Sequence, residues 1–315
     1  MSNSNYISVA FYNLENLFDT TDDPHTLDDD FTIDGALQWT QERYENKLFK
    51  ISKAISKIGF EDVKRPPSIV GLAEVENKKV LNDLINYDGL KENNYDFVHH
   101  NSPDERGIDT ALLYRKGDFE VLESSSLTLM VYNLEKERDF TRDILYVRGN
   151  LHGEMVHIYV NHWPSRRDGA EGTAYKRITA AKTLVKHLES VKGTYPDAKF
   201  IIMGDFNDDP SSESINEHLL VDGLYNPMLT MLIPTEKGSA TYKGRWNLFD
   251  QIMISTNFFA TDQNALTFVR AEILSERFLA DWDKRFEGFP FRTYAGRKYL
   301  GGYSDHFPVY LILQN

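Results

Sequence analysis

The 315-residue chain contains no cysteine, so disulfide bonds, thiolate metal sites and cysteine nucleophiles are all excluded. Long hydrophobic runs are missing as well, because no apolar stretch approaches the roughly 18 residues that a membrane-spanning helix needs. Basic residues are scarce relative to acidic ones, 35 against 48. The net charge of −13 argues against a broad basic surface for nonspecific binding of duplex nucleic acid, although local cations can offset it beside a site.

Hydrophobic residues make up 41% of the chain and charged residues 26%, which is a globular composition. No linker, low-complexity tract or motif-level repeat divides the sequence, so we predict a single domain over residues 1–315. The N-terminal residues 1–5 are polar and lack the basic and apolar regions of a signal peptide. We therefore expect a cytoplasmic protein with no transmembrane segment, although a processed secreted or periplasmic form would look the same.

Apolar periodicity indicates the secondary structure. Alternating or unbroken apolar runs predict strands at residues 7–12, 68–73, 108–114, 119–126, 144–151, 156–160, 200–204, 246–254 and 309–313. Helical spacing predicts helices at residues 44–58, 80–85 and 173–191. Helices interleaved with so many strands predict layers of helix packed outside β-sheets.

Two stretches are less clear. Residues 19–34 hold seven aspartates and no Lys or Arg, but they lack the EF-hand spacing, so we expect a solvated acidic loop. Residues 258–300 are aromatic-rich and give no assignment. Basic and aromatic residues alternate between Trp282 and Tyr303, which fits a nucleic-acid strand or, slightly better, a small core of an inserted loop.

The most informative stretch is the apolar run 200–203 followed by Gly204, Asp205 and Asn207. The run predicts a strand buried on both faces. In an extended segment, residues two apart point to the same side, so a carboxylate and a carboxamide would lie together at the strand end. They could bind a cation or orient a water, or they could form an ordinary Asx-rich turn.

Polar residues recur at the ends of predicted strands throughout the chain. Each alone has a plain explanation as a turn residue, a helix cap or a surface histidine. Together, two histidines, several carboxylates and two asparagines are the side chains that metal-assisted hydrolysis requires. These residues are Asn13, Glu74, His162, Asp205, Asn207, Asp250, Asp305 and His306.

The blocks that contain them resemble the endonuclease/exonuclease/phosphatase (DNase I-like) superfamily. The Gly-Asp-Phe-Asn block at 204–207 and the Ser-Asp-His block at 304–306 are specific as a pair. The resemblance implies a four-layered α/β sandwich in which two packed, mainly antiparallel β-sheets are flanked by helices. The matching blocks keep the family's order and lie at residues 11–17, 71–76, 161–166, 204–207, 249–252 and 304–309.

The resemblance also implies one or two Mg²⁺ (or Mn²⁺) ions. Glu74 would be the main metal ligand, and Asn13 and Asp305 would complete or support the site. Such ions bind oxygen ligands and stabilise charge on phosphoryl groups.

The same resemblance assigns catalytic roles. His306 would contact the scissile phosphate and be oriented by Asp250. Asp205 would activate the attacking water as general base, with Asn207 orienting that water or the phosphate. His162 would donate to a phosphoryl oxygen or assist the leaving group.

We weigh three functional hypotheses. The first is a nuclease-like phosphodiesterase, a hydrolase in which metal, Asp and His assist water attack. The alternative is a phosphomonoesterase acting on a small-molecule or lipid-headgroup phosphate. The third hypothesis is a catalytically inactive binding module, and the intact set of site residues argues against it. The substrate is then a phosphoester, possibly of nucleic acid, with Ser165, Arg166 and Arg177 expected to hold phosphate groups, and no protein partner is predicted.

Overall fold

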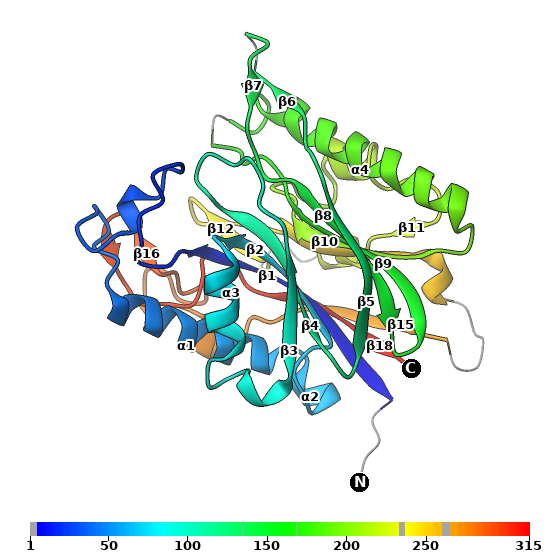
Figure 1. The fold of residues 1–315 in the computed structure, drawn as a ribbon, viewed down its shortest axis with the longest axis horizontal. Coiled ribbons are helices and arrows are strands. Elements are labelled where there is room, and N and C mark those ends of the chain that lie inside the picture. Colours follow the sequence, from blue (N-terminus) through cyan, green and yellow to red (C-terminus); the bar gives the residue numbers. More distant parts are fainter. Residues whose placement is uncertain (1–4, 134, 168, 233–236, 260–264) are drawn as a thin grey trace.

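The computed structural model describes residues 5–133, 135–167, 169–232, 237–259 and 265–315. Two six-stranded β-sheets pack face to face, with helices on their outer sides (Figure 1). This four-layered α/β sandwich confirms the predicted fold class. No helix in the described part of the chain is both long and apolar enough to cross a bilayer.

The first sheet has the strand order β15–β18–β1–β2–β4–β3. Neighbouring strands are antiparallel except for the central pair β1 and β2, which are parallel. Taken in spatial order, the strands are Thr267–Ile273, Val309–Gln314, Tyr6–Leu17, Ile69–Val75, Asp109–Arg115 and Tyr95–His99.

The second sheet repeats this plan with the order β11–β14–β10–β9–β8–β5. Again only the central pair, β10 and β9, is parallel. Taken in spatial order, its strands are Leu224–Tyr225, Asp250–Ser255, Lys199–Asp205, Glu154–His162, Ile144–Leu151 and Phe119–Leu127.

The remaining elements cover the sheets or lie at their ends. Helices α1 (Gln41–Lys57), α2 (Phe60–Val63) and α3 (Lys78–Ile85) belong to the first sheet's side, whereas α4 (Ala174–Thr194) covers the second (Figure 1). Helix α5 (Glu213–Asn216) follows β10. Three two-stranded pairs complete the fold: β6–β7 (Val131–Tyr132, Arg138–Asp139), β12–β13 (Ala240–Tyr242, Arg245–Asn247) and β16–β17 (Tyr294–Ala295, Lys298–Tyr299).

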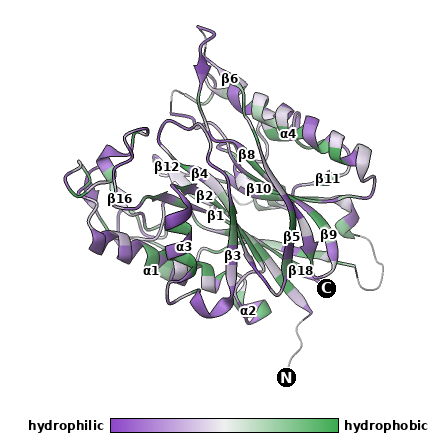
Figure 2. Cartoon of the chain, in the orientation of Figure 1, coloured by the Kyte–Doolittle hydropathy of each residue, from purple (hydrophilic) through white to green (hydrophobic). Residues whose placement is uncertain are grey.

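The alternation of side chains along the strands builds three apolar layers. In β10, Ile201 and Met203 lie in the cluster between the sheets, while Phe200 and Ile202 lie in the cluster beneath α4. Both faces of β10 are therefore buried, as its unbroken apolar run predicted. Figure 2 shows apolar residues concentrated along the strands of both sheets and polar residues on the outer loops.

The two sheets approach closely at one glycine. A Cβ atom placed on Gly71 of β2 would collide with the side chain of Met203 on the facing β10. Glycine at this position therefore allows the central strands of the two sheets to pack together.

The structure corrects one predicted strand. The sequence predicted a single strand over 246–254, but β13 ends at Asn247 and β14 begins at Asp250. The two residues between them bond elsewhere, since Leu248 N–H donates to Asp209 Oδ1 and the Phe249 carbonyl accepts from Phe206 N–H. These contacts tie the break to the loop after β10.

The two stretches that were unclear from the sequence take definite forms. In the acidic segment, Asp22, Asp23, Asp29, Asp30 and Asp34 are exposed as expected, but Asp19 and Asp28 are buried. The unassigned stretch contributes the edge strand β15; its residues 260–264 lie outside the described residues. Tyr294 and Tyr303 pack in the cluster beneath α1, while Trp282 remains 61% exposed. These two tyrosines thus extend the large apolar cluster between α1 and the first sheet, rather than forming a separate small core.

Candidate active site

The strand register of the second sheet brings three predicted site residues into one row. Asp205 is the last residue of β10, and it pairs with Asp250 of β14 on one side and with His162 of β9 on the other. Residues that are directly opposite on neighbouring strands project from the same face of a sheet. Three polar side chains separated by many residues in sequence are therefore adjacent.

Residues of the first sheet complete this row from across the sandwich. Asn13 Nδ2 of β1 donates to Asp205 Oδ2 at 3.1 Å, in a buried hydrogen bond. His306, which lies just before β18, bonds through Nδ1 to Asp250 Oδ2 at 2.7 Å. The site is thus assembled from both sheets, and it brings five of the predicted residues into direct contact or register.

His306 is held as a cation. Burial opposes its charge, but the surrounding carboxylates of Asp250, Asp305 and Asp205 outweigh that cost and raise the pKa of His306 well above its ordinary value. Its Nε2 atom lies 4.0 Å from Asp205 Oδ2 and 3.9 Å from Asp305 Oδ1. These separations exceed a hydrogen bond, so Nε2–H is available to another acceptor.

His162 has the opposite electrostatic character. Burial, followed by the positive charges of Arg142, Arg106 and His306, holds the pKa of His162 well below its ordinary value. Its buried Nδ1 atom has no hydrogen-bond partner among the residues that the structure describes, and Nε2 lies 3.7 Å from Glu74 Oε1. The pKa values of the two imidazoles are therefore shifted in opposite directions, a difference that suits separate acid–base roles.

Asp205 is the group around which the others are arranged. Burial, together with the charge of Asp250, raises the pKa of Asp205 to about 7, against the opposing effect of His306. Its Oδ1 accepts the backbone N–H of Asn207 at 2.9 Å. A carboxyl group that ionises near neutral pH is poised to accept a proton.

The structure corrects the geometry expected for Asn207. Its φ of 50° is left-handed rather than extended, so its side chain does not simply share a strand face with Asp205. Instead the backbone turns around the Asp205 carboxylate, and Asn207 Nδ2 donates to the Trp163 carbonyl at 2.9 Å. The Asx-turn and the site interpretation therefore both apply to this segment.

Glu74 and Asp305 each keep one carboxylate oxygen without a hydrogen bond within the described residues. Glu74 Oε2 accepts Asn16 N–H at 2.9 Å, and Asp305 Oδ2 accepts from Arg292 at 2.9 Å. Glu74 also has a left-handed φ of 63°, a strained conformation for a non-glycine residue. Strain of this kind is typical of residues whose side chains are held in place for a function.

The donor set fits a hard cation. Ligand atoms of Asp205, Asp250 and His306 lie within 4.8 Å of one another, and the buried Asp250 Oδ1 has no hydrogen-bond partner in the described part of the chain. Carboxylate oxygens are the ligands that Mg²⁺ and Mn²⁺ prefer. His306 Nδ1, in contrast, is already bonded to Asp250, so within this group the carboxylates are the better candidates for holding an ion. Glu74 and Asp305, the ligands that the resemblance implied, do not belong to this group.

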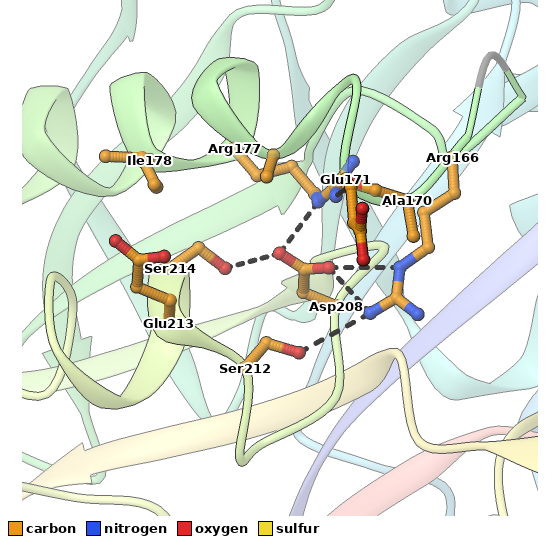
Figure 3. Close-up of a pocket in the computed structure, with 10 residues that line it drawn as sticks. Arg166, Ala170, Glu171, Arg177, Ile178, Asp208, Ser212, Glu213 and Ser214 are labelled. Atoms are coloured by element: carbon orange, nitrogen blue, oxygen red, sulfur yellow. Dashed lines mark hydrogen bonds and ion pairs between the residues drawn. The ribbon is translucent and has the colours of Figure 1, made fainter.

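Two arginines predicted to bind phosphate lie in a separate cluster around Asp208 (Figure 3). Arg177 Nε is 2.7 Å from Asp208 Oδ2, and its side chain is only 1% exposed. Arg166 donates from Nε and Nη2 to Asp208 Oδ1 at 3.0 and 2.6 Å. Ser214 adds a bond to Oδ2 at 2.5 Å. The guanidinium groups therefore hold the loop after Asn207.

A pocket of about 190 Å³ lies beside this cluster, between the start of α4 and α5. Arg166, Arg177 and Asp208 line it, and Figure 3 shows their mutual contacts. Ser165 is exposed. The structure does not bring Arg177 into the row of Asp205, and the spacing of the buried residues Ala181, Leu184 and Leu188 with Arg177 explains why: Arg177 lies on the buried face of α4.

Sequence reasoning missed two other arginines. Arg142, which precedes β8, donates to the Trp163 carbonyl at 2.9 Å and to Asp104 Oδ2 at 3.0 Å. Arg106 lies on the loop between β3 and β4, and its charge acts on His162 together with that of Arg142. Arg106 precedes Gly107 and a strand, but no local pattern indicates that this loop reaches the site.

Comparisons with known proteins agree with this architecture. Residues 8–315 match the family described as "Endonuclease/Exonuclease/phosphatase family". Comparison with curated protein sequences gives no match.

Several solved structures share the fold. An endonuclease/exonuclease/phosphatase family protein of Bacteroides thetaiotaomicron is 16% identical, with 98% of this chain and 94% of that chain covered and a TM-score of 0.59. The mannosyl-6-phosphatase Bt3783 of B. thetaiotaomicron VPI-5482 is 17% identical, with 98% and 99% covered and a TM-score of 0.58. TDP2 of D. rerio, in complex with a single-strand DNA product, is 16% identical, with 98% and 99% covered and a TM-score of 0.57.

Proposed function

Because the chain belongs to the endonuclease/exonuclease/phosphatase family, we propose that it is a metal-dependent phosphoesterase that hydrolyses a phosphodiester in a nuclease-like manner. One observation supports this most strongly. Asp205 Oδ2 lies 3.1 Å from Asn13 Nδ2, 3.8 Å from His162 Nε2 and 4.0 Å from His306 Nε2. An amide donor and two imidazoles whose pKa values are shifted in opposite directions thus surround the oxygen that would accept the proton.

The metal ligands in this proposal are Glu74 and Asp305, supported by Asn13. The unbonded oxygens of Glu74 and Asp305 and the abundance of carboxylates favour Mg²⁺ or Mn²⁺. A bound ion of this kind supplies positive charge to a phosphoryl oxygen.

Four side chains then share the proton transfer and the hydrogen bonding to the substrate. Asp205 removes a proton from the attacking water, since its pKa of about 7 makes it an effective base near neutral pH. His306, kept cationic and oriented by Asp250, donates Nε2–H to a non-bridging phosphate oxygen. His162, as a neutral imidazole, donates a hydrogen bond, without transferring its proton, to a phosphoryl oxygen or to the leaving-group oxygen, and Asn207 orients the water.

A phosphomonoester is the alternative substrate. The net charge of −13 favours a small substrate over a long polyanion, and one structural neighbour is a mannosyl-6-phosphatase whereas another was captured with a DNA product. The catalytic groups serve either substrate, because both reactions displace an oxygen from phosphorus.

The test is hydrolysis of bis-p-nitrophenyl phosphate and p-nitrophenyl phosphate side by side, with EDTA, Mg²⁺ or Mn²⁺. We expect metal-dependent turnover of the diester, abolished in Asp205→Asn and His306→Ala and retained in the control Asp88→Asn, whose carboxylate is 79% exposed. Preference for the monoester would favour the alternative substrate. Near wild-type turnover in both site variants, with correct folding by circular dichroism, would refute the catalytic assignment.

A further inference from the structure

The arginines near the site differ in how fully their guanidinium groups are used. Arg142 is 6% exposed, and it bonds to Asp104 and to the Trp163 carbonyl. Arg166 and Arg177 are engaged by Asp208. Arg292 donates to Asp305. Each of these four guanidinium groups therefore already bonds to a protein acceptor, although Arg292, at 41% exposed, also keeps donors toward solvent.

Arg106 is arranged differently. Its side chain is 38% exposed, and the closest carboxylate oxygen, Asp104 Oδ1, lies 3.7 Å from its Nε. That separation is longer than a hydrogen bond. Within the described residues, the guanidinium of Arg106 therefore retains donors for a ligand.

The loop that carries Arg106 is firmly built. Asp104 Oδ1 accepts the backbone N–H of Arg106 at 3.1 Å, and the Asp104 carbonyl accepts Gly107 N–H at 3.0 Å. The Glu105 carbonyl accepts Leu27 N–H at 2.7 Å. Gly107 has a φ of 70°, and a Cβ there would collide with Thr26. The backbone at Arg106 is thus fixed from both sides.

A chain of contacts places this loop beside the catalytic groups. Asp104 is bonded to Arg142, Arg142 donates to the Trp163 carbonyl, and Asn207 Nδ2 donates to that same carbonyl. Trp163 directly follows His162, the last residue of β9. Arg106 therefore lies on the His162 side of the site.

We propose that Arg106 is a substrate-binding residue, whose guanidinium donates to a phosphate oxygen of the substrate on the His162 side of the site. This inference rests on the proposed function, because it deepens the recognition of a phosphoester by the same site. Asp104 and Arg142 are positioning residues. They hold the loop, and the Asp104 carboxylate offsets the positive charges of Arg106 and Arg142. Two sources supply the same ligand chemistry, namely the scissile phosphate itself and a neighbouring phosphate of a nucleic-acid chain.

The test compares Arg106→Gln and Arg106→Lys with the control Arg270→Gln. Arg270 on β15 is a fair match, since it is 40% exposed and paired with Asp62, away from the site residues. We measure KM and kcat for bis-p-nitrophenyl phosphate and for an oligonucleotide, and the inhibition constant of inorganic phosphate. Arg106→Gln should raise KM or the inhibition constant by about tenfold or more, as expected for a lost charge-assisted bond. Arg106→Lys should fall between, because it keeps the charge without the planar fork.

The outcomes separate the sources. Equal effects on both substrates would place the scissile phosphate at Arg106, and an effect on the oligonucleotide alone would place a neighbouring phosphate there. If Arg106→Gln changes neither KM nor phosphate inhibition, or if Arg270→Gln changes them as much, the inference is wrong. If the wild type hydrolyses no ester, the proposed function fails instead, and calorimetric titration with phosphate then decides on Arg106: equal affinity in wild type and Arg106→Gln, or no binding to the wild type, would overturn it.

Discussion

His306 Nδ1 lies 2.7 Å from Asp250 Oδ2, joining the segment just before β18 of the first sheet to the first residue of β14 in the second. The Asp250 side chain is fully buried, so this bond is made where water cannot compete with it. The pairing fixes the orientation of the imidazole and sustains its positive charge.

Asp250→Asn should preserve this geometry while removing the charge. We expect kcat to fall by about 10²- to 10⁴-fold, in line with general acid–base contributions. The pKa of His306 should also fall, because its largest favourable interaction is lost. Steady-state kinetics and histidine NMR titration check both effects. A variant with unchanged kcat would show that the pairing is structural only.

Activity should depend on pH through Asp205. Only its ionised form accepts a proton, so kcat/KM should rise with pH and level off above about 7, before any shift to lower pH caused by bound cation. A pH–rate profile at several metal concentrations measures this. A profile that falls as pH rises from 5 to about 7 would exclude Asp205 as the base.

The same shift has an opposite effect on stability. The folded state binds the Asp205 proton more tightly than the unfolded chain, because its pKa is raised from 3.8 to about 7. The contribution of this carboxyl to stability is therefore present at low pH and decreases as pH rises through that window. Metal-free Asp205→Asn should gain stability relative to wild type between pH 4 and about 7, which thermal unfolding would detect.

The Asp208 cluster should matter more for stability than an exposed ion pair. Asp208→Ala leaves Arg166 and the buried Arg177 without their shared partner, and we expect a loss of about 3–5 kcal/mol in the free energy of unfolding. Asp88→Ala, which breaks an exposed pair with Lys91, should cost far less. Denaturant titration compares the two. Equal small losses would mean that the clamp contributes little.

The close approach of the sheets predicts the effect of adding one methyl group. Gly71→Ala forces Met203 or the strands to move, so we expect a loss of about 1–3 kcal/mol. Gly117→Ala is the control, because its Cβ would meet no atom within 4 Å. Chemical denaturation of both variants tests the comparison. A neutral Gly71→Ala would show that the interface between the sheets is adaptable.

Strands buried on both faces, such as β10, were predicted because an unbroken apolar run is visible in sequence. The edge strand β5 was predicted as well, although most of its residues are half-buried or exposed. β3 and β15 were not predicted because most of their residues are only half-buried, and their mixed composition gives no clear alternation. Edge strands of this kind depend on pairing with a neighbour rather than on their own pattern.

The same contrast between local and nonlocal features applies to the prediction of the candidate site. Asp205 and Asp250 were found because they accompany apolar runs and lie in blocks that resemble the family, whereas the strand register that places them opposite each other is seen only in the structure. Arg177 was assigned to substrate because its partner, Asp208, is distant in sequence and its ion pair is invisible there. Arg106 was missed for the converse reason, since only the folded loop brings it to the site. Nonlocal charge pairing is what the sequence alone does not reveal.

The hydrogen bonds Asn13–Asp205 and His306–Asp250 both cross from one sheet to the other. A chain in which either sheet had formed alone would carry half of the site and should be inactive. During synthesis, His306 is among the last of these residues to be made, just ahead of β18. We therefore expect no hydrolytic activity from the nascent chain until its two sheets dock. Activity should appear together with the finished tertiary structure.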